Sequence, residues 1–181
     1  MERHLTLIAL FAALIAALGL IPQLTLAFGV PVTAQSLGVM LCGTVLGARR
    51  GALAVLLFVL LVALGLPLLA GGRGGLAVFV SPTAGFVIGF PFAAFVTGLI
   101  VENFRNGPLA LVASIAAIFG GIVVLYAFGV TGMAWALQKS LPEAALLITA
   151  FLPGDVIKAV LAGLITAALA RARPDSVLSR A

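Results

Sequence analysis

Two ionisable residues lie inside an otherwise apolar stretch near the end of the chain. Asp155 and Lys158 are three positions apart within residues 151–158, so in a helix they share a face and can touch. Pro153 and Gly154 are expected to break or bend the helix just before them. Together the two side chains offer a ligand one acceptor and one cationic donor. The alternative is an ion pair that only neutralises itself inside the protein.

Two further clusters of polar or glycine residues interrupt the apolar sequence. Thr33 and Gln35 open one apolar stretch, where a buried amide needs a hydrogen-bonding partner. A glycine-rich loop, residues 71–75, comes shortly before Thr83, and its glycines let the backbone approach a small ligand closely. The alternative for this loop is an ordinary flexible connection. The candidate ligand-binding residues are therefore Asp155, Lys158, Gln35, Thr33, Gly72, Arg73, Gly74 and Thr83.

The elements that must position these residues are helices in lipid. Of the 181 residues, 64% are hydrophobic and 8% are charged, and the mean hydropathy is +1.33. Soluble domains carry about 25% charged residues, so a soluble fold, a disordered chain, a disulfide-rich scaffold and a nucleic-acid binder are excluded. A helix that crosses the membrane needs about 20 apolar residues. We predict an all-α membrane protein, one domain over residues 1–181, with six transmembrane helices near 5–21, 31–47, 51–66, 83–101, 108–128 and 144–170.

The basic residues predict how the chain is oriented. Nine basic residues lie in predicted loops or near the ends of the chain. If the N-terminus is cytoplasmic, Arg73 and Lys139 fall outside and the other seven fall inside. This is the positive-inside pattern, and it places both termini in the cytoplasm and the chain in the cell inner (cytoplasmic) membrane. All three polar clusters then lie toward the outer face. The basic residues that fall inside are Arg3, Arg49, Arg50, Arg105, Arg171, Arg173 and Arg180.

The first apolar stretch has a second interpretation, as a signal peptide. Arg3 and His4 would be its charged start, and the residues Thr25-Leu26-Ala27 would be its cleavage site. We favour a transmembrane helix, because nothing after the stretch resembles a translocated soluble domain. Near the outer end of the fifth predicted span, Tyr126 and Trp135 are expected to take an interfacial aromatic role.

Several catalytic motifs are missing from the sequence. There is no phosphate-binding loop of the G-x-x-x-x-G-K-[ST] type, so the chain cannot hydrolyse ATP itself. With His4 the only histidine, no Ser/His/Asp set exists. Cys42, the only cysteine, is expected to be a small buried hydrophobe. We therefore expect no enzyme activity, no catalytic residue, no metal and no cofactor. Two alternatives are an intramembrane enzyme that uses Asp155 as acid or base and a purely structural membrane subunit.

Small side chains recur on one stripe of the first predicted helix. Ala9 and Ala13 are four positions apart, and Ala16 follows Ala12 at the same spacing. Such spacing lets a second helix approach closely in lipid. The stripe serves either packing within this chain or docking of another membrane protein.

Taken together, the motifs resemble the BioY family, the biotin-specific substrate-binding (S) components of energy-coupling factor (ECF) vitamin transporters. The resemblance covers the chain from about Leu5 to Ala170, and its motifs occur in family order with matching spacing. They are residues 31–35, Leu46-Gly47 and Gly51, residues 65–67, the glycine loop, residues 81–86 and residues 153–158.

The resemblance implies a six-helix S-component fold that binds biotin from outside and mediates its uptake. It also implies a transmembrane T component and cytoplasmic ATPase subunits as partners, with Ala9, Ala13 and Ala16 as the docking face. The alternatives are an S component for another vitamin and a small stand-alone vitamin facilitator.

In the family an Asp and a Lys near the ligand's ring system correspond to Asp155 and Lys158. Asp155 is then expected to accept from the ureido N–H groups of biotin, while Lys158 binds the ureido carbonyl or holds the Asp155 carboxylate in place. Arg73, Gln35, Thr33 and backbone N–H groups remain candidates for the valerate carboxylate. The family's loop residues around the ureido head would correspond to residues 71–75. This chain has Arg73 and no Asn there, so it departs from the family pattern in this loop.

Overall fold

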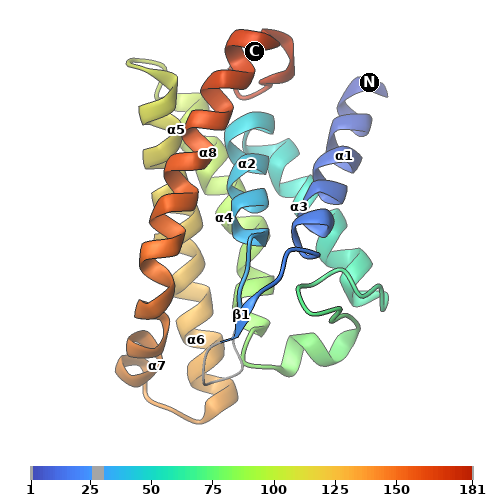
Figure 1. The fold of residues 1–181 in the computed structure, drawn as a ribbon, viewed down its shortest axis with the longest axis vertical. Coiled ribbons are helices and arrows are strands. Elements are labelled where there is room, and N and C mark those ends of the chain that lie inside the picture. The colour runs from blue at the N-terminus through green and yellow to red at the C-terminus, as the bar shows by residue number, and fades with distance from the viewer. Residues whose placement is uncertain (1, 26–30, 181) are drawn as a thin grey trace.

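Long helices that run up and down between two ends make up almost all of the fold (Figure 1). The structure is a computed structural model, and it describes residues 2–25 and 31–180. The helices within those residues are α1 (Glu2–Leu18), α2 (Gln35–Leu46), α3 (Ala48–Ala63), α4 (Ala84–Asn103), α5 (Leu109–Ile118), α6 (Leu125–Leu137), α7 (Leu141–Ile148) and α8 (Leu152–Ala172). A π-helical segment, Phe119–Val124, joins α5 to α6, and 3-10 turns occupy Leu76–Val80, Thr149–Phe151 and Pro174–Ser176.

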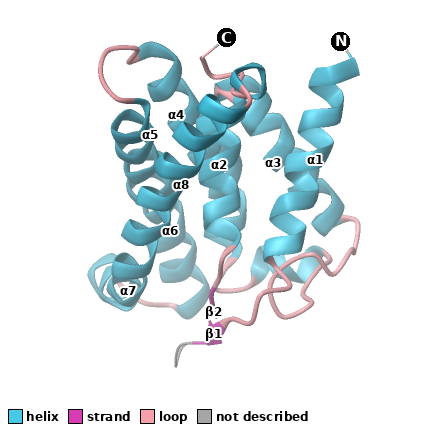
Figure 2. Ribbon diagram, turned by 45° about the horizontal axis from the view of Figure 1, so that its top comes forward, coloured by secondary structure: helices cyan, strands magenta, loops and turns pink. Residues whose placement is uncertain are grey.

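Three helical stretches among the described residues are long and apolar enough to cross a membrane. They are Ala84–Asn103, the continuous Leu109–Leu137 and Leu141–Ala172. The helix α2 is apolar but has 12 residues, and α1 and α3 have 17 and 16. The prediction of an all-helical fold is therefore confirmed, with one small departure. Two-residue strands, β1 (Leu24–Thr25) and β2 (Pro31–Val32), pair antiparallel at one end of the bundle (Figure 2).

Two predicted helix starts differ from the observed ones for local reasons. The second helix was expected from residue 31, but it begins at Gln35 because residues 31–32 pair with β1. The helix break was expected at Pro153, but it lies at Thr149–Phe151, and Pro153 stands in the first turn of α8. Proline is tolerated there because the first N–H groups of a helix have no intrahelical partner. Of the candidate signal-peptide cleavage site, Leu26 and Ala27 lie outside the described residues.

Glycines bring α4 into backbone contact with its neighbours. A Cβ added at Gly43 of α2 would lie 2.6 Å from the Ala94 carbonyl oxygen. A Cβ added at Gly98 would lie 2.3 Å from the Ala48 nitrogen, at the start of α3. Helices in lipid associate through such close packing, and α4 packs against α2, α3, α5 and α6. Cys42 lies in this core with no exposed surface, as expected.

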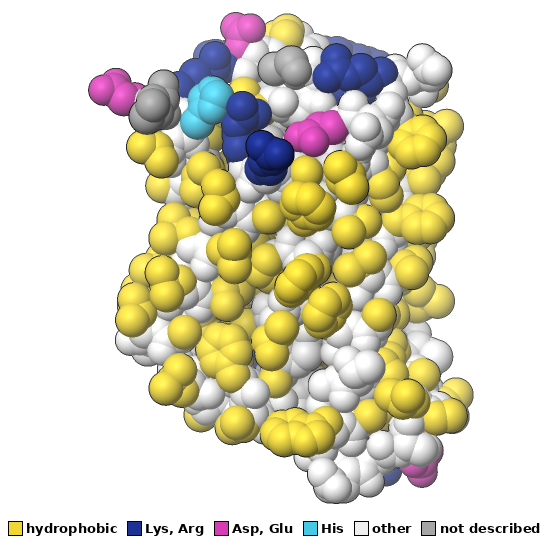
Figure 3. All heavy atoms as spheres, turned by 180° about the vertical axis from the view of Figure 1, so that it is seen from behind, with side chains coloured by type: hydrophobic (Ala, Val, Ile, Leu, Met, Phe, Trp, Pro, Cys, Tyr) yellow, Lys and Arg dark blue, Asp and Glu magenta, His cyan; other side chains and the backbone are white. Residues whose placement is uncertain are grey.

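Both described ends of the chain lie at the same end of the bundle (Figure 1). The Arg3 guanidinium donates to the Asp175 carbonyl there, and Val177 to Ser179 are buried. The Ser179 hydroxyl donates to the Thr44 carbonyl, and its backbone N–H donates to the Val45 carbonyl at 3.0 Å. Lys and Arg side chains gather at this end above a band of hydrophobic ones (Figure 3). Loops and the β1–β2 pair occupy the opposite end (Figure 2).

Candidate functional site

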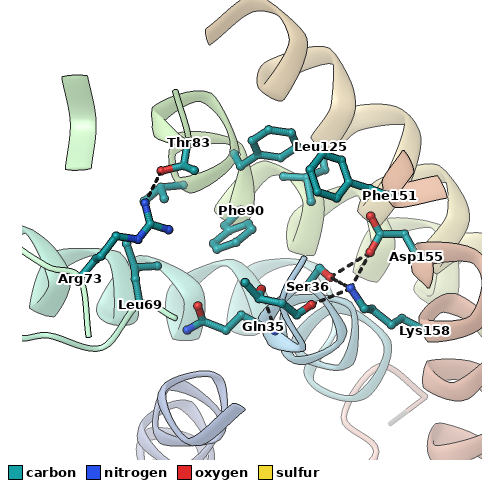
Figure 4. A pocket seen from close by; sticks show the side chains of 13 residues that line it. Gln35, Ser36, Leu69, Arg73, Thr83, Phe90, Leu125, Phe151, Asp155 and Lys158 are labelled. Atoms are coloured by element: carbon teal, nitrogen blue, oxygen red, sulfur yellow. Dashed lines mark hydrogen bonds and ion pairs between the residues drawn. The ribbon is translucent and has the colours of Figure 1, made fainter. Parts of the chain in front are cut away.

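A cavity lies at the end of the bundle opposite the termini, where α2, α4 and α8 all begin. It contains about 570 Å³ of space not filled by atoms, part of it open to the surroundings. The cavity is lined by Thr33, Gln35, Ser36, Leu69, Arg73, Thr83, Phe86, Val87, Phe90, Leu125, Phe151, Asp155 and Lys158. Figure 4 shows Arg73 with Thr83 on one side of it and Asp155 with Lys158 on the other.

The predicted contact between Asp155 and Lys158 is confirmed. The Lys158 ammonium lies 2.8 Å from Asp155 Oδ1, three positions along α8. Asp155 is only 6% exposed and stands in the first turn of α8, where a negative charge is favoured by the helix dipole. Among the described residues, this is the only ion pair within 4 Å.

The start of α2 completes the surroundings of Lys158. Its ammonium also donates to the Thr33 carbonyl at 2.6 Å and to the Ser36 hydroxyl at 3.0 Å. An ammonium has three donors, so all three are used within the protein. In this geometry Lys158 holds Asp155 against the start of α2.

Tyr126 is a site residue that sequence reasoning missed. Its hydroxyl donates to Asp155 Oδ2 at 2.8 Å, a contact that the predicted interfacial role did not include. The Trp135 side chain, by contrast, is 64% exposed. The Ser36 hydroxyl donates to Asp155 Oδ1 at 3.2 Å. Nothing in the sequence separates Tyr126 from an interfacial tyrosine, because its partner lies 29 positions later.

Arg73 and Thr83 form the second polar group of the cavity. The Arg73 guanidinium donates from Nη1 to Thr83 Oγ1 at 3.1 Å and from Nε to the Ala70 carbonyl at 3.2 Å. Partial burial lowers the pKa of the Arg73 guanidinium from its ordinary value, yet an arginine stays charged in proteins. A guanidinium carries five N–H donors, so at least one nitrogen remains free to bind an anion.

Gln35 lines the cavity but is engaged by the fold itself. Its amide nitrogen donates to the Ile15 carbonyl at 3.1 Å and to the Leu68 carbonyl at 3.0 Å, and its oxygen accepts from the Ala70 N–H at 3.0 Å. Both amide donors are therefore used. Gln35 joins the end of α1 to the glycine-rich loop and has no donor left for a ligand.

The glycine-rich loop contributes its arginine rather than its glycines. Leu69 and Arg73 exchange backbone hydrogen bonds of 3.0 and 3.2 Å, which closes a tight turn with positive φ at Gly71 and Gly72. A Cβ added at Gly74 would lie 2.2 Å from the Leu66 carbonyl oxygen. Gly72 and Gly74 thus shape the turn that presents Arg73, and neither is among the residues that line the cavity.

Apolar side chains line the cavity between the two polar groups. Phe90, Leu125 and Phe151 lie between them in Figure 4. The rings of Phe86 and Tyr126 pack edge to face, with their centroids 6.4 Å apart. Sequence reasoning missed these residues as well. The spacing of Phe86 and Phe90, one helical turn apart on α4, was the available signal, but it equally fits an ordinary core.

The predicted docking face lies on α1, away from the cavity. Ala9 and Ala13 are exposed, whereas Ala16 is half-buried and packs against the core. Ala17 is exposed and continues the same stripe. Among the described residues, no group of three or more His, Cys, Asp or Glu side chains could hold a metal ion.

Comparisons with known proteins identify the family of this chain. The model of the BioY family matches residues 2–175. The chain is 55% identical to the biotin transporter BioY of Rhodobacter capsulatus, over 99% of this chain and 100% of that protein. It is 59% identical to the biotin transporter BioY of Rhizobium etli, over 90% of each chain. A solved structure, the S-component for biotin from an ECF-type ABC transporter, superposes with a TM-score of 0.89 at 29% identity, over 94% of this chain and 92% of the other. The chain belongs to the BioY family.

Proposed function

We propose that this protein is the biotin-binding S component of an ECF-type transporter and captures biotin for uptake across the cytoplasmic membrane. It is a transport protein and not an enzyme. The observation that carries the proposal is the cavity with an anchored carboxylate on one side, an arginine on the other and apolar side chains between them. Its relatives' names supply the ligand.

The shape of biotin suits this distribution of polar groups. Its ureido ring presents two N–H donors and one carbonyl, and its valerate chain ends in a carboxylate. Asp155 already accepts three hydrogen bonds, and a carboxylate has about four acceptor positions. The remaining position accepts a ureido N–H, and Lys158 keeps the carboxylate in place. Arg73 binds the valerate carboxylate, and Phe90 and Phe151 cover the apolar part.

The placement in the membrane follows from the distribution of charge. We infer six crossings with both termini cytoplasmic, since the basic residues gather at the end of the bundle that carries the termini. The cavity then opens toward the outside, where biotin enters. The exposed alanines of α1, Ala9 and Ala13, face a T component, which with its ATPase subunits energises uptake. Ala16 contributes less, because it packs against the chain's own core.

Calorimetric titration of the purified protein with biotin tests the site. Asp155→Asn keeps the shape of the side chain but removes its charge, and we expect biotin affinity to fall about 10- to 100-fold. Lys158→Ala should have a similar effect, because it releases Asp155 from α2. Unchanged affinity in both variants would contradict the assignment. Competition by thiamine or riboflavin against labelled biotin would favour the alternative of another vitamin.

The role of Arg73 is tested with two ligands rather than one. Arg73→Gln should weaken the binding of biotin about 10- to 100-fold. It should hardly change the binding of biotin amide, which has no carboxylate charge. Equal losses for both ligands would show that Arg73 shapes the loop instead of binding the carboxylate.

A further inference from the structure

A second cavity, a groove, lies at the end of the bundle that carries the termini. It runs between the first turn of α3 and the last turns of α4 and contains about 1,030 Å³ of space not filled by atoms, part of it open. Arg49 and Arg50 line it from α3, and Phe95 and Leu99 line it from α4. Ala48 also lines it and is buried. None of these residues belongs to the biotin site.

Close helix packing fixes the two sides relative to each other. Gly98 stands against the backbone of Gly47 and Ala48, where an added Cβ would lie 2.3 Å from both the Gly47 carbonyl carbon and the Ala48 nitrogen. Phe95 and Leu99 flank Gly98 on α4, so they are held next to the turn from which Arg49 and Arg50 project. The groove is therefore a fixed feature of the fold.

The arginines have no carboxylate partner in the described part of the chain. Lys158 and Asp155 form the only ion pair found there within 4 Å. Glu102 also lines the groove, but its Oε1 accepts the Ala48 N–H at 3.0 Å, so its charge faces the start of α3. Arg49 is exposed and Arg50 is half-buried, which leaves two guanidinium groups available to an anion.

The other side of the groove is suited to hydrocarbon. Phe95 is 40% and Leu99 is 42% exposed, and both stand on α4, which is long and apolar enough to cross a membrane. A ligand that satisfies both sides has an anionic head and an apolar chain. Guanidinium groups bind phosphate through paired hydrogen bonds, and basic pockets on the cytoplasmic side of membrane proteins bind anionic lipid head groups.

We propose that this groove binds an anionic phospholipid, with the phosphate between Arg49 and Arg50 and an acyl chain along Phe95 and Leu99. The basic side chains of this end stand above the hydrophobic band of the molecule (Figure 3), and basic side chains next to a membrane-spanning segment attract anionic lipid head groups. The lipid would fasten the α2–α3 turn to α4 from outside the bundle.

Native mass spectrometry and thermal unfolding of the detergent-purified full chain test the proposal. Phosphatidylglycerol should bind and raise the melting temperature, while phosphatidylcholine and inorganic phosphate should not. Arg49→Gln/Arg50→Gln should weaken phosphatidylglycerol binding by at least about tenfold. The matched control is Arg171→Gln/Arg173→Gln, which removes the same charge from exposed positions at the same end and should bind like the unchanged protein.

Three outcomes would overturn the proposal. If Arg49→Gln/Arg50→Gln and Arg171→Gln/Arg173→Gln weaken phosphatidylglycerol binding equally, only the general positive charge of this end attracts the lipid. Equal binding of phosphatidylcholine would show that the arginines play no part, and a response to phosphate alone would show an anion site without lipid. If Arg49→Gln/Arg50→Gln does not fold, two single variants supply the same comparison with Arg171→Gln. They are Arg49→Gln, which changes an exposed side chain, and Phe95→Ala. Each must weaken phosphatidylglycerol binding more than Arg171→Gln does.

Discussion

Three helices contribute one hydrogen-bond donor each to the carboxylate of Asp155. Ser36 donates from α2, Tyr126 from α6 and Lys158 from within α8. Burying a carboxylate is costly unless it is paired and hydrogen-bonded, and these three contacts offset that cost. They also fix the direction of the acceptor position that remains. A ligand N–H therefore meets a preorganised acceptor, which reduces the entropy lost on binding.

Tyr126→Phe tests this anchoring by removing a single hydroxyl. We expect the free energy of unfolding to fall by about 1 to 2 kcal/mol, because a hydrogen bond to a charged group is lost. Biotin affinity should fall less than in Asp155→Asn, since the carboxylate keeps two of its donors. Denaturant unfolding in detergent and calorimetry measure the two effects. A loss of affinity as large as that of Asp155→Asn would mean that Tyr126 itself contacts the ligand.

At the scale of elements, α2 links the two ends of the molecule. Its first turn carries Ser36 of the proposed biotin site, and its last carbonyls accept from the C-terminal segment through Ser179. The N–H that would normally bond the Thr44 carbonyl, that of Ala48, donates to Glu102 instead. The Ser179 hydroxyl therefore satisfies a carbonyl that the helix leaves open.

Ser179→Ala should lower the free energy of unfolding by about 1 to 2 kcal/mol, because the buried Thr44 carbonyl loses its partner. Ser176→Ala is the matched control. The Ser176 hydroxyl makes only a local bond to the Arg173 carbonyl at an exposed position, so its removal should cost little. Equal stability of the two variants in denaturant would contradict the capping role of Ser179.

Two glycine-to-alanine substitutions, at Gly98 of α4 and at Gly154 of α8, should change the free energy of unfolding in opposite directions. Gly98→Ala forces a Cβ to 2.3 Å from backbone atoms. We therefore expect overpacking to lower the free energy of unfolding by about 1 to 3 kcal/mol. A Cβ at Gly154 would meet nothing within 4 Å, and Gly154→Ala should stabilise α8 by about 0.4 to 1 kcal/mol. Thermal unfolding distinguishes them, and a tolerated Gly98→Ala would show that the two backbones can move apart.

At the scale of the whole molecule, the orientation can be tested with single cysteines. Leu76→Cys, at a position that is 74% exposed and follows Arg73 by three residues, should react with a membrane-impermeant maleimide in intact cells. Ala172→Cys, exposed at the other end, should react only after the membrane is opened. The native Cys42 has no exposed surface and should remain unlabelled throughout. The reverse labelling pattern would place the termini outside.

Much of the site was predictable because charge is scarce in this sequence. Asp155, Lys158 and Arg73 stand out against an apolar background, and the structure brings them to one cavity. Tyr126 and Phe90 were not predictable, because an aromatic residue has the same sequence signature in a core, at a membrane interface and in a binding site. Gln35 was identified as a polar residue in need of partners, but which partners it finds depends on the folded loop.

The fold followed the hydropathy pattern except where backbone geometry intervened. Apolar length predicts that helices exist, yet their ends depend on local contacts that hydropathy does not record. The pairing of β1 with β2 delays the start of α2. The turn at Thr149–Phe151 separates α7 from α8 before the proline is reached.

The two polar groups of the proposed biotin site also determine its net charge. Arg73 and Lys158 each carry a formal positive charge and Asp155 carries a negative one, so the empty cavity holds one excess positive charge. A monoanionic ligand cancels it. Keeping a net charge at membrane depth is costly, and moving one through a membrane potential costs or yields about 2.3 kcal/mol per 100 mV. The loaded site would therefore be nearly indifferent to the membrane potential, whereas the empty site would respond to it.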